Sequence, residues 1–333
     1  MPAHISRRRA LKAVASAALV SAMPRSGFAQ WRPKEAIRII VPAAPGGTTD
    51  VMGRLLGQHL QAAWGQTTVV ENKSGGGGTI GTAEYLRQRP DGHTILIGNP
   101  GPNAIAFSIF RNLPYKPEQI QAVSNLIRIP NIISAHPSVP VHSIGDLIAY
   151  LKANPDGLSY ATSGPGQSPH LSGAWFLQLT GLKMAHIPFR GAGPALAAAL
   201  GGQVPILFDN LFPSLPQVRD GKLRALAVTT SDRSAIAQDI PTVRESAPDV
   251  LGRYDVSSWF GVFLQSEAPA DVTAALNHEI KQFLERADIK ARISDLGARA
   301  DHGTPAQFAA FVRGETEKFA EIIRKENLQM DVN

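Results

Sequence analysis

Cysteine is absent from this chain of 333 residues, and its absence excludes several chemistries. A chain without thiols forms no disulfide, has no cysteine nucleophile or cysteine-ligated metal, and carries no lipid-modified N-terminal cysteine. Common catalytic signatures are missing too, since the sequence contains no G-x-S-x-G, H-E-x-x-H or G-x-x-x-x-G-K-[ST] motif. Its nine histidines show no metal-ligand spacing. We therefore expect no enzymatic activity, no metal and no cofactor.

An excess of charge of one sign is also absent once an N-terminal leader is set aside. Residues 1–29 contain five Lys or Arg and no acidic residue, so they account for five of the six net positive charges and leave the rest of the chain at +1. A nearly neutral chain gives no reason to expect nucleic acid or a membrane surface as a partner.

The leader itself has the order of an export signal. Basic residues within 7–12 precede a short apolar run, Ala13–Val20, and small residues precede a cleavage point after Ala29. We expect 1–29 to be a signal peptide that sends the chain to the periplasm. The pattern resembles a twin-arginine signal but lacks the usual aromatic at Ala10, so the general secretory route stays open. An uncleaved anchor is disfavoured because the apolar run is too short to span a bilayer.

What the chain does contain is a repeated unit of strand, glycine-rich turn and helix. In the first unit Ile39–Val41 is a β-branched run, Pro45-Gly46-Gly47 turns the chain, and apolar residues recur at helical spacing over Val51–Leu60. Candidate N-caps are Thr48, Thr49 and Asp50. Free backbone N–H groups and the positive end of the helix dipole would converge at this turn, which favours an anion. One such turn alone is as typical of a tight connection that binds nothing.

Two further units follow in the same order. The runs Thr67–Asn72 and Thr94–Ile97 predict strands, and they lead into the glycine-rich segments Gly75–Gly78 and Gly98–Pro102. Three units in succession predict a parallel sheet whose loops meet at its carboxyl edge, where open α/β folds bind ligands. The repetition therefore favours a binding site over three empty turns.

A second set of units occupies the middle of the chain. Strand-like runs occur at 158–162, 184–188, 204–208 and 224–230, and turns with predicted helices follow the first two. Extended stretches at 123–135 and 256–264 flank this set, and predicted helices follow the second stretch. With 333 residues the chain is long enough for two domains, and we expect the two stretches to carry it from one domain to the other and back.

Several side chains near these turns have more than one interpretation. Arg190 stands in a glycine turn, where it can fork onto a ligand carboxylate or, with equal weight, form a surface or interdomain ion pair. We expect Trp175 and Phe176 in the core rather than stacked on a ligand. Nothing in the sequence spacing supports an acid–base pair between Asp50 and a histidine.

Taken together, these segments resemble the Bug-type periplasmic receptors, the TctC-like solute-binding components of tripartite tricarboxylate transporters. The resemblance covers nearly all of the chain after the leader and rests on Val41–Asp50, Glu71–Gly81, Pro90–Thr94, Asn112–Tyr115, Tyr160–Gly166, His186–Gly191, Gly202–Val204 and Pro241–Val243. Each fragment is weak alone, but their order and spacing together are specific.

The resemblance implies an α/β fold of the two-lobed type II periplasmic binding protein class (Venus flytrap), in which each lobe is a βα sheet domain and two strands cross over. Lobe one would comprise 30–127 with 257–333, and lobe two 128–256. An organic carboxylate would be captured between the lobes, largely by backbone and hydroxyl hydrogen bonds and by water. Its partners would be the membrane permease subunits of a transporter, and the chain would be a monomer. Two other functions stay open: an exported enzyme that uses the same cleft, and a sensor whose liganded form docks a signalling protein.

The resemblance also implies which residues border the ligand. From lobe one these are Ala44, Gly46, Gly47, Thr48, Asp50, Gly76, Gly77, Gly78, Thr79 and Asn99. From lobe two they are Thr162, Ser163, Gly164, Gln167, His170, Arg190, Gly191 and Asp209. The family often has an aromatic residue where Ala43 stands. A small residue there removes a wall of the pocket, which disfavours the usual short dicarboxylates and favours a bulkier ligand.

Overall fold

The computed structural model describes residues 31–325 and 327–331, so the expected signal peptide lies outside the described residues. Every element named below belongs to one compact unit, which begins at Arg32. Within the described ranges, no helix has both the length and the apolar character that crossing a membrane requires.

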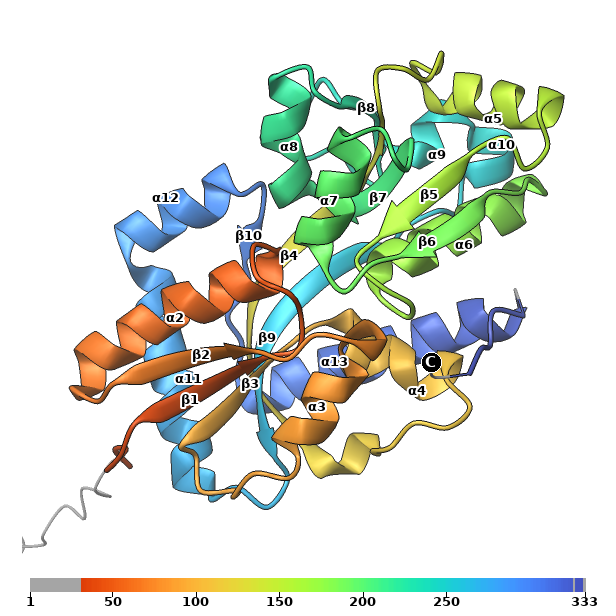
Figure 1. Ribbon diagram of the computed structural model, residues 1–333. Helices are drawn as coiled ribbons and strands as arrows, with labels where there is room; N and C mark the ends of the chain where they lie inside the picture. Colours follow the sequence, from red (N-terminus) through yellow and green to blue (C-terminus); the bar gives the residue numbers. More distant parts are fainter. Residues whose placement is uncertain (1–30, 326, 332–333) are drawn as a thin grey trace, which may run out of the picture. The chain divides into compact units, whose positions relative to one another are not determined.

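In the described part of the chain, ten strands form one mixed sheet (Figure 1). Their spatial order is β2-β1-β3-β9-β4-β7-β5-β6, and both β8 and β10 pair with β4. The strand bounds are β1 Ile37–Val41, β2 Thr68–Asn72, β3 Thr94–Gly98, β4 Ile120–Ala135, β5 Ser159–Thr162, β6 Ala185–Pro188, β7 Ile206–Asn210, β8 Arg224–Val228, β9 Ser257–Gln265 and β10 Arg299–Ala300. β1 pairs in parallel with β2 and β3, and β5 does so with β6 and β7. Both ends of the sheet therefore consist of the parallel βα units that the glycine turns predict.

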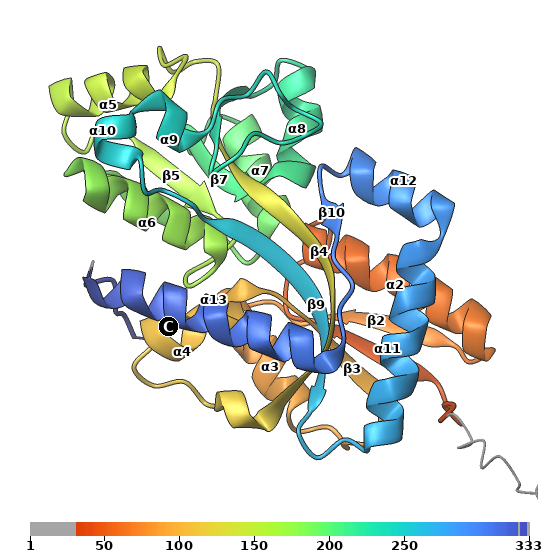
Figure 2. The same ribbon diagram turned by 180° about the vertical axis from the view of Figure 1, so that it is seen from behind.

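The long strand β4 joins these two ends. Its part Ile120–Pro130 pairs antiparallel with β9, and its part Asn131–Ala135 pairs with both β7 and β8. Pro130, which has no N–H to donate, stands at the change of partners, opposite Ser257 at the start of β9. Figure 2 shows β4 and β9 running side by side through the unit. The two extended stretches expected from the sequence are thus confirmed as strands, and the structure shows in addition that they pair with each other.

Helices cover the faces of this sheet. Their bounds are α2 Thr48–Trp64, η2 Gly76–Gly78, α3 Thr79–Tyr85, η3 Gly101–Ile105, α4 Ala106–Ile109, η4 Pro117–Gln119, α5 Ile144–Ala153, α6 Ser168–Thr180, α7 Ala192–Leu200, α8 Leu211–Arg219, α9 Val243–Ser246, α10 Pro248–Leu251, α11 Ala270–Glu285, α12 Ala287–Asp295 and α13 Pro305–Lys325. α2 packs on β1 and β2 and against α11, whereas α13 packs on β4, η3 and α4. The C-terminal helices therefore return to the βα units with which the described chain begins.

Prolines explain where the observed helices differ from the predicted ones. The helix after the third glycine turn begins as a π-helix at Gly101, inside the predicted turn, with Pro102 in its first turn. The sequence analysis also missed α8, which contains Pro216. A proline inside a helix removes one backbone hydrogen bond, so local propensity argues against a helix that packing nevertheless forms. The lobe limits at 127/128 and 256/257 stay a prediction.

The core contains the aromatic residues that the sequence analysis assigned to it. Trp175 keeps 6% of its surface exposed and stacks on Tyr254, with 5.1 Å between ring centroids, while Phe176 is fully buried. In the other half, Trp259 on β9 and Phe308 on α13 meet edge to face at 5.9 Å. The burial of Trp175 and Phe176 confirms that both belong to the core.

A glycine on β9 tests the packing of the last helix. A Cβ built on Gly261 would lie 2.3 Å from Phe308 Cζ and 2.9 Å from the backbone oxygen of Ser124. We expect Gly261→Ala to lower the free energy of unfolding by about 1–3 kcal/mol, because neither neighbour can move away freely. Thermal melts measure this. The matched control, Gly314→Ala in α13, meets nothing within 4 Å and should raise stability by up to about 1 kcal/mol. A Gly261→Ala protein that melts like the parent would show that α13 does not pack here.

Candidate functional site

One cavity of about 310 Å³ lies at the carboxyl ends of six strands, β1, β2, β3, β5, β6 and β7. It is lined by Pro42, Ala43, Gly47, Thr48, Thr49, Ser74, Gly75, Gly76, Gly77, Gly78, Ile80, Asn99, Pro100, Ser163, Pro165, Gln167, Ser168, Pro169, Pro188, Phe189, Arg190, Gly191, Ala192, Asn210, Ser258 and Phe260. Parallel strands leave their connecting loops at this edge of a sheet, so the loops of both ends meet around the same space.

Five helices begin at this cavity. Their N-cap residues all line it and are Gly47 (α2), Gly78 (α3), Gln167 (α6), Gly191 (α7) and Asn210 (α8). None of the five makes a side-chain cap hydrogen bond. The first-turn N–H groups of a helix have no partner within the helix, and its N-terminus carries a partial positive charge. The cavity therefore collects donors and positive potential from the backbone, which suits an anion.

Asp50 holds the first loop together behind the cavity lining. Its carboxylate accepts hydrogen bonds from the Gly46 N–H and from Asn72 Nδ2, each at 3.0 Å, and pairs with Arg54 at 2.9 Å. Burial raises the pKa of Asp50, but these hydrogen bonds and the Arg54 charge outweigh burial and hold the pKa below its usual value. The turn itself needs glycine, since Gly46 has a φ of +88°.

The second loop, Gly75–Gly78, has a backbone conformation that residues other than glycine would adopt only with strain. All four glycines have positive φ, from +55° to +127°. Gly77 approaches the facing loop so closely that a Cβ there would lie 1.8 Å from the backbone oxygen of Pro165. Gln167 Nε2 also donates a hydrogen bond to the Gly77 oxygen at 2.7 Å. Thr79 supports the loop from behind, because its hydroxyl donates to the Gly76 oxygen at 2.8 Å.

Asn99 follows β3 directly and lines the cavity. Its side-chain oxygen accepts a hydrogen bond from the Gly101 N–H at 2.9 Å, and its own backbone N–H donates to Asn103 Oδ1 at 3.1 Å. These two bonds fix the start of η3. The orientation of Asn99 at the cavity is therefore set by the π-helix that follows it.

Two stacked histidines, His170 and His186, support the loop that follows β5. His170 Nδ1 accepts a hydrogen bond from the Gly166 N–H at 3.1 Å, and His186 Nε2 lies 2.7 Å from Thr162 Oγ1. The two rings are 4.3 Å apart. Burial lowers the pKa of His170 to about 3, with a contribution from His186, and lowers that of His186 to about 4. Both imidazoles are therefore neutral at pH 7, and they position the loop rather than titrate in the cavity.

Two neighbouring residues at the end of β7 have different environments. Asn210 lines the cavity, whereas Asp209 is fully buried. Ser214 donates a hydrogen bond to Asp209 Oδ2 at 3.3 Å, and Oδ1 has no partner among the described residues. Burial raises the pKa of Asp209 to about 7. Successive strand residues point to opposite faces, which explains why the neighbour of the predicted residue reaches the cavity.

Arg190 lines the cavity with an exposed side chain, and its backbone links two loops. Its backbone oxygen accepts a hydrogen bond from the Ala44 N–H at 3.2 Å. Gly191 follows so close to the first loop that a Cβ there would lie 2.8 Å from Ala44 Cβ. Ala44 therefore stands at the contact between the loops rather than in the lining.

The predicted site residues fall into two groups. The cavity lining includes Gly47, Thr48, Gly76, Gly77, Gly78, Asn99, Ser163, Gln167, Arg190 and Gly191. It does not include Ala44, Gly46, Asp50, Thr79, Thr162, Gly164, His170 and Asp209. The contacts above place members of the second group in the loops and strand ends that hold the first. Which of them bind a ligand stays a prediction.

The sequence analysis did not name several lining residues as ligand-binding. Most flank named residues in the same loops, and adjacency to a glycine turn was the available signal for Thr49, Ser74 and Ser168. Ser258 and Phe260 are different, because they come from β9 and no glycine turn marks them. The long-range pairing of β9 with β3 and β4 brings these two residues to the cavity.

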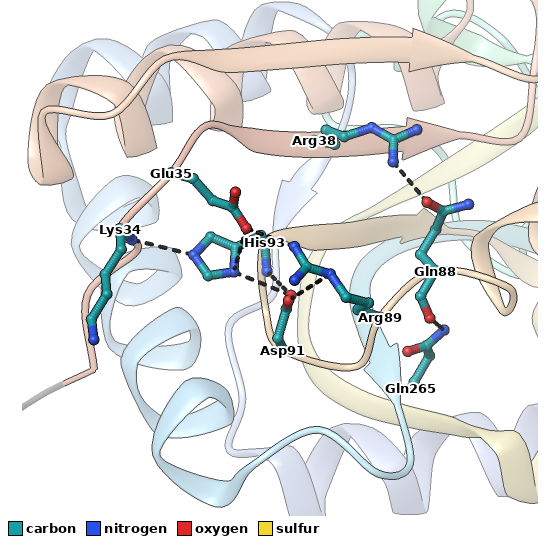
Figure 3. A network of polar contacts seen from close by, with 8 residues as sticks. All are labelled: Lys34, Glu35, Arg38, Gln88, Arg89, Asp91, His93 and Gln265. Atoms are coloured by element: carbon teal, nitrogen blue, oxygen red, sulfur yellow. Dashed lines mark hydrogen bonds and ion pairs between the residues drawn. The ribbon is translucent and has the colours of Figure 1, made fainter.

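A separate polar cluster lies at the opposite end of β3 (Figure 3). Its carboxylates and ring nitrogen, from Glu35, Asp91 and His93, are close enough to hold a metal ion. Arg89 pairs with Glu35 at 2.8 Å and with Asp91 at 3.3 Å, and His93 contacts Asp91 at 3.1 Å. The backbone N–H of Lys34 occupies the other ring nitrogen of His93 at 3.2 Å. These contacts satisfy the cluster from within, and we assign no ion to it.

The fold and the cavity at its strand ends define a two-lobed periplasmic binding protein of type II. A model of the tripartite tricarboxylate transporter family receptor (TctC) matches residues 52–328, and the chain belongs to that family. It is 34% identical to the protein BugT of Bordetella pertussis over 297 residues, which is 88% of this chain and 90% of BugT.

Solved structures of similar proteins agree with this assignment. The Rpa4515 protein of R. palustris, solved with adipate, is 32% identical with a TM-score of 0.85, over 89% of this chain and 98% of that one. MatC of Rhodopseudomonas palustris, solved with bound malate, is 29% identical with a TM-score of 0.83, over 87% and 99%. The matched family consists of receptors.

The buried carboxyl of Asp209 predicts a pH dependence of stability. With its pKa near 7 in the folded chain and near 3.8 in the unfolded chain, the folded state keeps a proton that the unfolded state releases between about pH 4 and pH 7. Stability from this group therefore falls as pH rises through that window, by an amount on the order of a few kcal/mol. We expect the melting temperature of Asp209→Asn, relative to the parent, to rise between pH 5 and pH 8. The histidines titrate alike in both proteins, so they cancel. A constant difference would contradict the raised pKa.

Proposed function

We propose that this chain is a periplasmic receptor that binds an organic carboxylate in the cavity and presents it to the membrane permease of a tripartite tricarboxylate transporter. The observation that carries the proposal is the convergence of five helix N-termini without side-chain caps on one cavity. Each such terminus stabilises a nearby anion by about 0.3–1 kcal/mol. The ligands of two structural relatives, adipate and malate, support a carboxylate.

The cavity has the groups for binding but not for acid–base catalysis. Among the described residues that line it, Arg190 has the one ionisable side chain. A general acid or base must reach its substrate within hydrogen-bond distance, and the lining contains no Asp, Glu, His, Lys or Tyr. Thr48 lines the cavity, and its buried hydroxyl has no partner among the described residues. These features favour a receptor over an enzyme that uses the same cleft.

The lining also bears on ligand size. Ala43 lies in it together with the apolar residues Ile80, Phe189 and Phe260. Because a methyl group stands where an aromatic ring would narrow the pocket, we propose a carboxylate bulkier than the short dicarboxylates. A thermal-shift screen of carboxylates of increasing length, with turnover assays in parallel, tests the receptor function. A ligand that stabilises the chain and is recovered unchanged is expected, and reproducible turnover abolished by a cavity substitution would contradict it.

The first glycine loop provides the sharpest test of the site. Gly47 has a φ of −86° and a ψ of 172°, which valine adopts without strain. A Cβ there would meet Ala192 Cβ at 3.2 Å and would cover the N-terminus of α2. We expect Gly47→Val to weaken binding of the best carboxylate from the screen at least about tenfold, or 1.4 kcal/mol, by calorimetric titration.

The control is a glycine at another helix N-terminus, outside the cavity. Gly145→Val in α5 is suitable because its Cβ would meet one atom at an ordinary 3.5 Å, whereas Gly221 has a φ of +70° and would be strained. Unliganded melting curves check that both variants fold. If Gly47→Val folds like the parent and its affinity is unchanged, the carboxylate does not lie at this loop.

A further inference from the structure

An apolar contact joins the two ends of the sheet outside the cavity lining. Phe110 follows α4, on the chain between β3 and β4, whereas Gly166 lies in the loop between β5 and α6. A Cβ built on Gly166 would lie 2.9 Å from Phe110 Cε2 and 3.0 Å from its Cζ, so the edge of the ring touches the glycine backbone. A larger residue would clash with the ring, and its backbone would be strained at the φ of +72° that Gly166 adopts.

The segment after α13 lies beside α4 and holds Phe110 in this position (Figure 1). Met330 forms an isolated parallel bridge with Phe110. Its N–H donates to the Ile109 oxygen at 2.8 Å, and its oxygen accepts from the Arg111 N–H at 3.2 Å. These bonds fix the backbone on both sides of Phe110, which keeps only 6% of its surface exposed. The position of the ring therefore depends on a segment that is distant in the sequence.

The loop that Phe110 touches is the one that approaches the second glycine loop. On either side of Gly166, Pro165 and Gln167 line the cavity. The backbone oxygen of Pro165 faces Gly77, and Gln167 donates its hydrogen bond to the Gly77 oxygen. The loop is thus held against the other end of the sheet at two places, by Gly77 and by the ring of Phe110. The second contact lies outside the cavity, since Phe110 does not line it.

We infer that Phe110 is a positioning residue for binding, which stabilises the arrangement in which both ends of the sheet face one ligand, and that Leu328–Asp331 supports it there. Apolar surface between Phe110 and the facing loop is removed from water in this arrangement, so the contact favours it even without a ligand. The apparent affinity of a ligand scales with the populated fraction of the state that binds it. The effect on affinity rests on the proposed receptor function, whereas the effect on the arrangement does not.

The absence of cysteine from the chain makes the arrangement measurable. Ala62→Cys on α2 and Ala153→Cys on α5 replace exposed residues on helices that Figure 1 shows at opposite ends of the molecule. Dyes on these two positions of residues 30–333 report the distance between the ends by single-molecule energy transfer, without ligand. We expect Phe110→Ala to lower at least about fivefold the ratio of molecules at the distance of this structure to molecules at longer distances. By calorimetric titration, the affinity for the best carboxylate from the screen should fall in proportion to the remaining fraction.

Matched controls separate positioning from a general loss of stability. Phe283→Ala removes a ring that is at least as buried and that packs against His59, away from the facing loop, so it should destabilise the chain without changing the ratio. Met330→Pro removes the N–H that donates to Ile109 and should lower the ratio as Phe110→Ala does. Met330→Ala keeps that N–H and should leave the ratio within about twofold.

If the unliganded melting curve shows that Phe110→Ala does not fold, Met330→Pro carries the test, with Met330→Ala as its control. A ratio that both variants leave unchanged, or that Phe283→Ala lowers equally, overturns the inference and leaves the receptor function in place. A parent without ligand that shows no molecules at the distance of this structure overturns it too. A ratio that falls as expected, in a chain that binds no carboxylate of the screen, supports the positioning role of Phe110 and overturns the receptor function.

Discussion

The close approach of two glycine loops across the cavity is the contact on which the rest of the site depends. Gly77 comes so near the backbone oxygen of Pro165 that no side chain fits between them, and Gln167 closes the gap with a hydrogen bond to Gly77. Ala44 and Gly191 make the equivalent contact on the other side. Backbone meets backbone at both places. Helix N-termini from both ends of the sheet can therefore face one small ligand, which longer side chains would prevent.

The residues behind these loops explain why the loops hold their conformation. Asp50 binds the N–H of Gly46, Thr79 binds the oxygen of Gly76, and His170 accepts from the N–H of Gly166. Each of these polar side chains is buried and hydrogen-bonded to a glycine backbone rather than exposed to the cavity. A glycine loop alone is flexible, because glycine loses more conformational freedom on folding than any other residue. The polar side chains offset part of that cost and leave the cavity to the backbone.

These arrangements set the limit of what could be predicted from the sequence. A glycine turn between a β-branched run and an amphipathic helix is a local signal, so β1, β2, β3 and their loops were predicted, and parallel pairing placed those loops together. The sequence analysis named Asp209, whereas Asn210 lines the cavity, and this difference depends on which face of β7 is turned to the cavity. Ser258 and Phe260 reach the cavity through the long-range pairing of β9 with β3 and β4. No local sequence pattern predicts that long-range pairing.

The most direct measurement is a crystal structure of residues 30–333 with the tightest-binding carboxylate from the ligand screen. The account predicts carboxylate oxygens within about 2.7–3.2 Å of backbone nitrogens at the start of α2 or in Gly76–Gly78, in the cavity between the two glycine loops. A carboxylate bound elsewhere, or one held in the cavity by Arg190 alone without contact to these backbone groups, would contradict the claim that helix N-termini form the site.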